Sequence, residues 1–139
     1  LPHSSMELAS GKAHIILSSR DILSVPYTTV VSFATERFRK ENPKLYDAVA
    51  KGLLDAIAFI NSNTREAADI YMAREPFLGT PEDLLKMMKG ETADELSFTP
   101  VPNSTKTFMD FMHKSGTLRK TPDSWKDVWF ENVWGMNGS

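Results

Sequence analysis

Two short β-type runs in an otherwise helical pattern constrain what this chain can fold into. Residues 13–17 and 28–33 crowd β-branched and aliphatic side chains between polar residues, which predicts two strands. A third, shorter extended piece is expected at 96–100. So few strands do not cover the apolar faces of many helices. The sequence therefore predicts either a piece of a larger α/β protein or a chain that completes its sheet by association.

The helical segments are well punctuated. From Pro43, with Asn42 as the expected cap, Leu45, Val49 and Leu53 recur at the spacing of one helix face. A second apolar stripe on the same segment predicts a helix covered on two sides. Further helices are expected at 34–41 and, after an Asn63–Glu66 capping box, at 64–74. Another helix is expected to begin at Pro81 with Thr80 as its cap, and one more is expected between Asn103-Ser104 and Gly116. A turn is expected at 121–130.

Composition excludes several classes of function. The net charge is −2 and no basic stripe is present, which argues against a nucleic-acid partner. With no cysteine among the 139 residues, disulfides, thiolate catalysis and cysteine-ligated metals are all excluded. No apolar run reaches the ~18 residues that span a bilayer.

No catalytic or metal-binding constellation is visible. His3, His14 and His113 are dispersed without metal-ligand spacing, so we expect no metal site, no cofactor and no catalytic group. The three tryptophans allow two readings: a tail that docks its aromatic face onto a core, which the spacing of Trp125 and Trp129 favours, or an aromatic box for a cation.

The polar connection between the first two runs is the candidate binding segment. It is either a surface turn or a place where two structural units meet around a ligand. Hydroxyls and a guanidinium there suit a small polar or anionic solute. The candidate ligand-binding residues are Ser18, Ser19, Arg20, Asp21, Tyr27, Thr28 and Thr29.

Four stretches carry a family resemblance. They are "ELASGKAHIILSSRDIL", "TTVVSFATERFRKENPKLYDAVAKGLLDAIAFI", "FMDFMHKSGTLRKTPDSWKDVWF" and the closing "NGS". In this order they resemble the C-terminal part of solute-binding proteins of ABC transporters. The group that they resemble is the nitrate, sulfonate and taurine type, which is related to binders of thiamine precursors.

The resemblance implies a fold and a function. It implies an α/β fold in which two lobes are joined by crossing strands, and this chain would be the C-terminal portion. Residues 1–23 would form the end of the second lobe and the hinge crossing. Residues 24–139 would belong to the first lobe. The ligand would lie between the lobes, with Arg20 as its anion-binding fork and Asp21 orienting that fork.

The expected function is solute capture without chemistry, for a membrane permease, in the periplasm or anchored outside the cell. The alternatives are an enzyme like the thiamine-pyrimidine synthases and a stand-alone helical interaction module. We also expect the 139-residue chain to self-associate, because its predicted strands lack partners.

Overall fold

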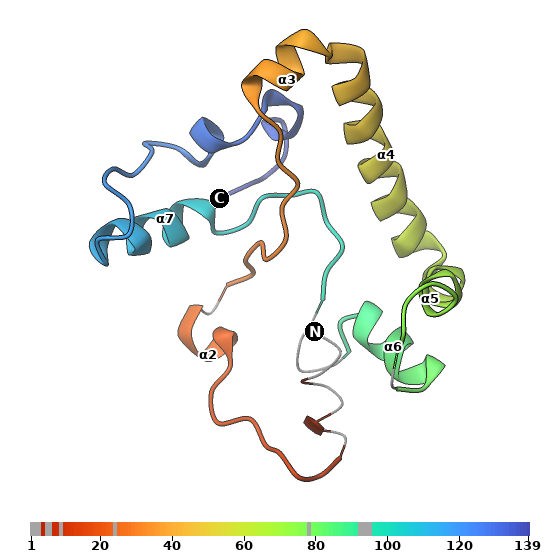
Figure 1. Cartoon of the computed structure of the whole chain (residues 1–139). Helices are drawn as coiled ribbons and strands as arrows, with labels where there is room; N and C mark the ends of the chain where they lie inside the picture. The colour runs from red at the N-terminus through yellow and green to blue at the C-terminus, as the bar shows by residue number, and fades with distance from the viewer. Residues whose placement is uncertain (1–3, 5–6, 9, 24, 78, 92–95) are drawn as a thin grey trace. The chain divides into compact units, whose positions relative to one another are not determined.

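The computed structural model describes all residues except 1–3, 5–6, 9, 24, 78 and 92–95, and the side chain of Arg20 also lies outside the described part. Over the described residues the chain is helical and forms no strand (Figure 1). The elements are α2 (Ser19–Leu23), α3 (Glu36–Glu41), α4 (Pro43–Ser62), α5 (Thr64–Met72), α6 (Pro81–Met88), α7 (Thr105–Lys114) and the 3-10 helices η1 (Trp125–Val128) and η2 (Glu131–Val133).

The expected α/β fold is therefore wrong for this structure. Residues 13–17, 28–33 and 96–100 contain no strand. Ile16 is 90% exposed and Phe33 94% exposed, so these runs bury little apolar surface. β-branched side chains favour strands only where neighbouring strands pair with them and cover them. Without such neighbours the composition of the runs is not sufficient to form a sheet. The 96–100 piece instead joins α4 through its Phe98 carbonyl, which accepts a hydrogen bond from Asn61 Nδ2 at 2.9 Å.

The chain divides into two compact units, each made from two stretches of sequence. Unit 1 combines residues 1–16 and 35–99, and unit 2 combines residues 17–34 and 100–139. The expected division at residues 23 and 24 stays a prediction, and Ser24 lies outside the described residues.

Unit 1 has its small core between α5 and α6. Ala68, Leu84 and Met87 are buried there. Helix α6 begins with the predicted cap: Thr80 Oγ1 accepts from the Asp83 N–H at 3.2 Å, and Asp83 Oδ2 accepts from the Thr80 N–H at 2.9 Å. The cap holds the first turn of α6, and Leu84 follows directly after it. The core is completed by the partly buried Met72, Phe77, Leu85, Met88 and Leu96.

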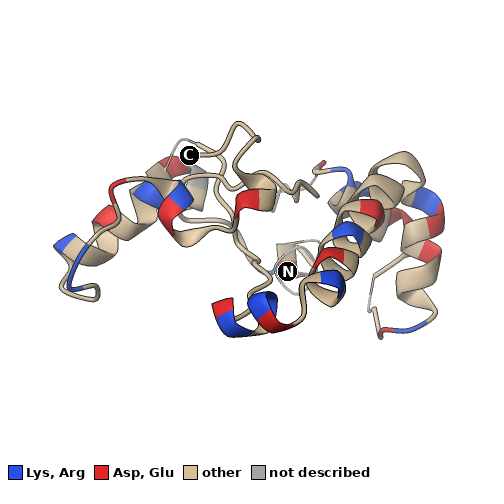
Figure 2. Cartoon of the chain, turned by 90° about the horizontal axis from the view of Figure 1, so that it is seen from above, with Lys and Arg blue, Asp and Glu red and all other residues tan. Residues whose placement is uncertain are grey.

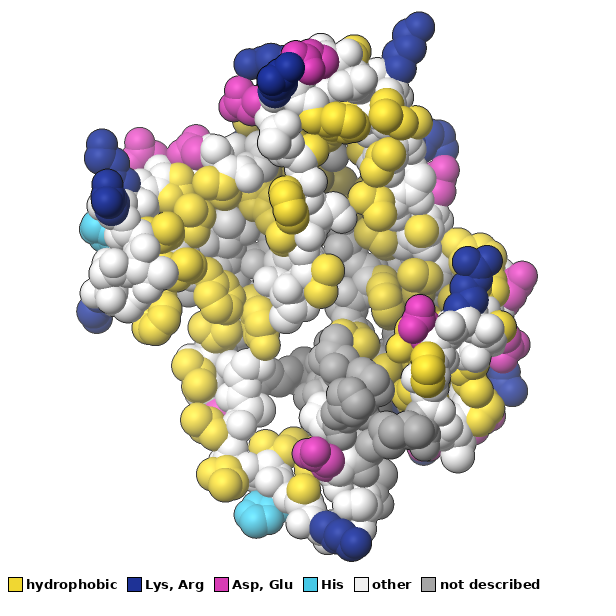
Figure 3. Space-filling model, in the orientation of Figure 1, with side chains coloured by type: hydrophobic (Ala, Val, Ile, Leu, Met, Phe, Trp, Pro, Cys, Tyr) yellow, Lys and Arg dark blue, Asp and Glu magenta, His cyan; other side chains and the backbone are white. Residues whose placement is uncertain are grey.

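Helix α4 has the predicted position, but neighbouring elements do not bury its apolar faces as predicted. None of its residues is buried, and Leu45 and Val49 are each 54% exposed, so the expectation of cover on both sides is wrong. Figure 3 shows hydrophobic side chains at the surface along this helix. Asn42 and Asn63 lie at the expected cap positions of α4 and α5, but neither side chain makes the expected cap bond. Asn63 Nδ2 instead donates back to the Phe59 carbonyl at 3.3 Å.

Positively and negatively charged residues are interspersed along the helices rather than separated by sign (Figure 2). Several form exposed pairs one helical turn apart, such as Lys51 with Asp55 at 2.6 Å and Arg37 with Glu41 at 2.9 Å. Exposed pairs of this kind contribute at most a few tenths of a kcal/mol each. They mark solvated helix faces, and the folded state depends on the apolar contacts instead.

Candidate functional site

All seven predicted ligand-binding residues belong to unit 2: Ser18 directly precedes α2, three lie on α2, and three lie on the segment between α2 and α3. Two of them bind each other. Asp21 Oδ2 accepts from the Ser18 N–H and from Ser18 Oγ, both at 2.7 Å. These bonds, with the backbone bond the stronger, lower the pKa of the Asp21 carboxyl below its usual value. Ser18 and Asp21 therefore cap the start of α2, and Asp21 stays anionic at neutral pH.

Two more candidates are exposed to solvent. Ser19 is the first residue of α2 and is exposed, and Thr29 is exposed on the segment that follows. The side chain of Arg20 lies outside the described residues, so its expected role as an anion-binding fork stays a prediction. The same holds for the expected contact between Arg20 and Asp21.

Thr28 joins the candidate segment to the segment that precedes α7. Its N–H donates to the Asn103 carbonyl at 3.1 Å, and its Oγ1 accepts from the Asn103 N–H at 2.9 Å. Ser104 Oγ adds a bond to the Pro26 carbonyl at 2.6 Å. These three bonds bring together residues that are 75 to 78 positions apart in the sequence. Thr28 is thus a holding residue, with its hydroxyl already engaged.

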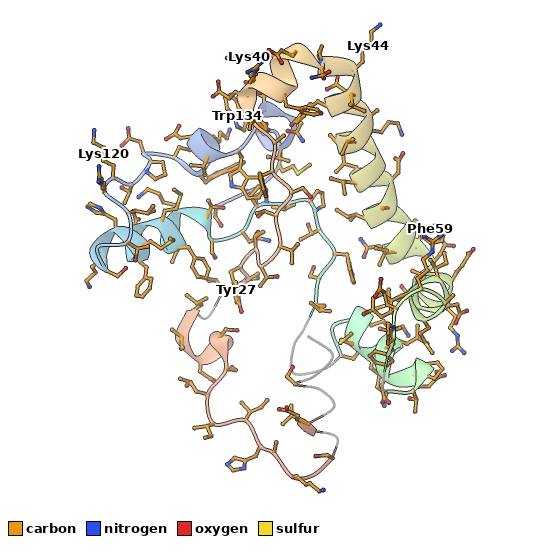
Figure 4. The ribbon with its side chains drawn as sticks, viewed as in Figure 1. Tyr27, Lys40, Lys44, Phe59, Lys120 and Trp134 are labelled. Carbon is orange, nitrogen blue, oxygen red and sulfur yellow. The ribbon has the colours of Figure 1, made fainter. Side chains whose placement is uncertain are left out.

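Tyr27 lies between these anchored neighbours and packs on α7. Figure 4 labels it on the segment leading from α2 to α3. Its ring centroid is 5.5 Å from that of Phe108, with the two planes tilted by 53°. This is an ordinary tilted contact between aromatic rings, and it fixes the ring's position. Tyr27 supports the segment through packing.

Ser104 organises the start of α7, and the sequence did not reveal how. It has a left-handed backbone with φ 56° and is only 3% exposed. Its N–H donates to Ser139 Oγ at 2.9 Å, while the Thr105 N–H donates to the Ser139 carbonyl at 2.7 Å and the Ser139 N–H donates to the Pro102 carbonyl at 2.9 Å. The expected side-chain cap by Ser104 is absent. The free N–H groups of this helix start are partly satisfied by residue 139 instead.

Two of the three tryptophans donate ring hydrogen bonds within unit 2. Trp129 Nε1 donates to Thr105 Oγ1 at 3.2 Å, and Trp134 Nε1 donates to the Trp129 carbonyl at 2.8 Å (Figure 4 labels Trp134). The chain's own Lys126 lies over the Trp125 ring, with Nζ 5.6 Å from the ring centroid. The bond from Trp129 to the first residue of α7 agrees with docking of the tail, and the aromatic box for an added cation stays a prediction.

The remaining polar groups form no reactive cluster among the described residues. No group of three or more His, Asp or Glu side chains there is arranged to hold a metal ion. His113 Nδ1 lies 2.9 Å from the Leu118 carbonyl, His14 is exposed, and His3 lies outside the described part. A shallow depression lined by residues 41–45 includes none of the predicted ligand-binding residues.

The search for known relatives gave no match. No protein family, no curated protein and no solved structure is similar enough to this chain to be matched. Within the described part, none of the helices has the length and apolar character needed to cross a membrane.

Proposed function

We propose that this chain is part of a solute-binding protein that captures a small polar or anionic solute and passes it to the membrane permease of an ABC importer. The observation that carries the proposal is the attachment of residues 26–28 to residues 103–104 by three hydrogen bonds. A binding segment needs a rigid support so that its contact groups keep their geometry. Thr28 and Tyr27 supply that support, while the neighbouring Thr29 stays exposed. The family resemblance of the ordered sequence stretches agrees with this reading.

We further propose that some of the candidate residues hold the segment in place and that others contact the solute. Ser18 and Asp21 are engaged with each other, and Thr28 with Asn103. Ser19 and Thr29 keep exposed hydroxyls, which suit the oxygen atoms of a sulfonate, carboxylate or nitrate. Arg20 adjoins Ser19 in the sequence and would add a planar, charged fork for the same anion. Solute capture without turnover is part of this proposal, with the Ser18 hydroxyl and the Asp21 carboxylate engaged in the cap of α2.

The test is thermal stabilisation of the protein expressed from its complete gene. A panel of sulfonates, carboxylates, nitrate and pyrimidines is screened, since a solute bound only by the native state raises the melting temperature. We expect one class of solute to raise the melting temperature and no product to form. Turnover of a pyrimidine or pyridoxal compound would favour the alternative of an enzyme like the thiamine-pyrimidine synthases. A panel without any stabilising solute would contradict the proposal.

A matched pair of variants separates contact from support. Thr29→Val removes an exposed hydroxyl, and we expect about 2- to 10-fold weaker solute binding with unchanged stability. Thr28→Val removes the acceptor of the Asn103 N–H, so the expected loss is in the melting temperature of the solute-free protein. Arg20→Ala should weaken an anionic solute by about 1.5–3 kcal/mol, the scale of a charged hydrogen bond. Equal effects of Thr29→Val and Thr28→Val on affinity and stability would refute this division.

A stand-alone helical interaction module is the second candidate, favoured by the uncovered apolar residues of α4. This function predicts that the 139-residue chain binds no small solute and acts through protein contacts alone. The solute panel therefore distinguishes the two functions directly.

A further inference from the structure

Helix α4 presents an apolar face that the described residues do not cover. On a helical projection Leu45, Val49, Gly52 and Ala56 follow one another at steps of four, three and four residues, so they share a face. Leu45 and Val49 are 54% exposed, Ala56 is exposed, and a Cβ atom at Gly52 would meet nothing within 4 Å. We call these four residues the α4 face.

We propose that the α4 face binds the α4 face of a second copy of this chain, with the two helices antiparallel about a two-fold axis. In an antiparallel pair with the axis between residues 50 and 51, Leu45 of one copy is level with Ala56 of the other. Val49 is then level with Gly52. Each large side chain faces a small one in every layer, so the helices approach closely and the side chains interdigitate. A two-fold axis repeats both contacts with the copies exchanged.

The charges beside the α4 face are self-complementary in the same register. Lys44 and Asp55 lie on one flank of the face, near its two ends. Antiparallel pairing places Lys44 of one copy about 3 Å along the axis from the level of Asp55 in the other, well within reach of a lysine side chain. In a parallel pair the two-fold axis would put these flanks on opposite sides of the interface, so Lys44 and Asp55 would not meet. Asp55 accepts from Lys51 at 2.6 Å within its own chain and has a second oxygen for Lys44 of the other copy.

The size of the contact sets the expected strength. From Leu45 to Ala56 the face is roughly 17 Å long, which is short for a standard interface of about 800 Å² per partner. We therefore expect a dimer that forms and dissociates with concentration rather than an obligate one. Sedimentation equilibrium of the 139-residue chain should show a mass that rises from 15.6 kDa toward twice that value with loading concentration. A mass of 15.6 kDa at every concentration would overturn the proposal.

Single cysteines test the register, because the chain contains none of its own. In the proposed dimer the two copies of residue 52 are offset by three residues, about 4.5 Å along the axis, so Gly52→Cys should cross-link into a covalent dimer under mild oxidation. Ala58→Cys is the control, since Ala58 is also small and exposed but lies on the opposite side of α4. We expect Gly52→Cys to cross-link at least tenfold faster. Equal rates would indicate random collision and overturn the proposal.

A second variant separates the dimer from the fold of the monomer. Gly52→Leu places its side chain in open space in the single chain and raises helix propensity, so the monomer keeps its helical circular dichroism. In the dimer the added side chain would collide with Val49 of the other copy. We expect Gly52→Leu to stay at 15.6 kDa where the parent chain dimerises. Undiminished dimerisation would show that the α4 face is not the interface.

Discussion

Leu84 is the residue on which unit 1 depends most, and Leu84→Ala measures that dependence. Its side chain is 2% exposed and packs with Ala68 and Met87 between α5 and α6. Truncating a buried leucine removes its transfer free energy and leaves a cavity, for a cost of about 2–5 kcal/mol. Partly exposed neighbours such as Met88 can move into the space, so we expect about 3 kcal/mol, near the low end of that range.

The assay is urea unfolding followed by far-ultraviolet circular dichroism. The three tryptophans all lie in unit 2, so their fluorescence would not report on the core of unit 1. Leu54→Ala on α4 is the matched control, because the substitution is the same and Leu54 is 38% exposed. We expect this control to lower the free energy of unfolding by less than about 1 kcal/mol. If Leu84→Ala and Leu54→Ala have equal effects, the α5–α6 contact is not the core of this unit.

Three further predictions concern single caps and turns. The hydrogen bonds from Thr80, of which the side-chain bond has the larger effect, lower the pKa of the Asp83 carboxyl in the folded state. The stabilisation from the ionised carboxylate is therefore complete above the pKa of the unfolded state, 3.8, and is lost as the pH falls through the pKa of the folded state. Asp83→Asn should therefore flatten the acid limb of a plot of unfolding free energy against pH. Gly138→Ala would bring a Cβ atom 2.9 Å from the Trp125 ring, and we expect tryptophan fluorescence to show unit 2 destabilised by about 1–3 kcal/mol. Gly116→Ala, at φ +82°, should cost about 1–2 kcal/mol in the same assay.

Each of these predictions has a contradicting result. An unchanged acid limb in Asp83→Asn would show that the charge of the Asp83 carboxylate does not contribute to stability. If Gly138→Ala leaves the fluorescence transition in place, the Trp125 ring moves without cost and the close contact is not structural. A neutral or stabilising Gly116→Ala would mean that the turn after α7 accepts a right-handed backbone.

The helix starts that the sequence predicted correctly depend on interactions between residues of the same helical turn. Thr80, Pro81 and Asp83 specify the start of α6 within four residues, because each interacts only with its own turn. The pattern Asn63 to Glu66 looks equally local, yet Asn63 bonds back to Phe59 in the preceding helix. Because α4 ends directly before α5, the Asn63 side chain lies within reach of the backbone of both helices. The sequence pattern indicates only the contact with α5.

Non-local pairing explains what the sequence did not predict. Residues 28–33 have the composition of a strand, but a strand forms only when a neighbouring strand pairs with it. The composition of one segment does not show whether such a neighbour exists. Ser18 and Asp21 were expected to contact a ligand, and their mutual bonds follow from a three-residue separation that suits a helix cap as well. The anchoring of Ser104 by Ser139 spans 35 positions and has no sequence signature.

Each unit is built from two stretches of sequence that are separated by a stretch of the other unit, and this affects the order in which the units fold. The bonds between Thr28 and Asn103 close a loop of 75 residues, most of which forms unit 1. Closing a long flexible loop is slow, because its entropy must be lost before the contact stabilises anything. The contacts of unit 1 between α5 and α6 connect close neighbours in sequence and form without that delay. Once α3 to α6 are in place, the loop is shorter and stiffer, so we expect the burial of the tryptophans to lag behind the gain of helix during refolding.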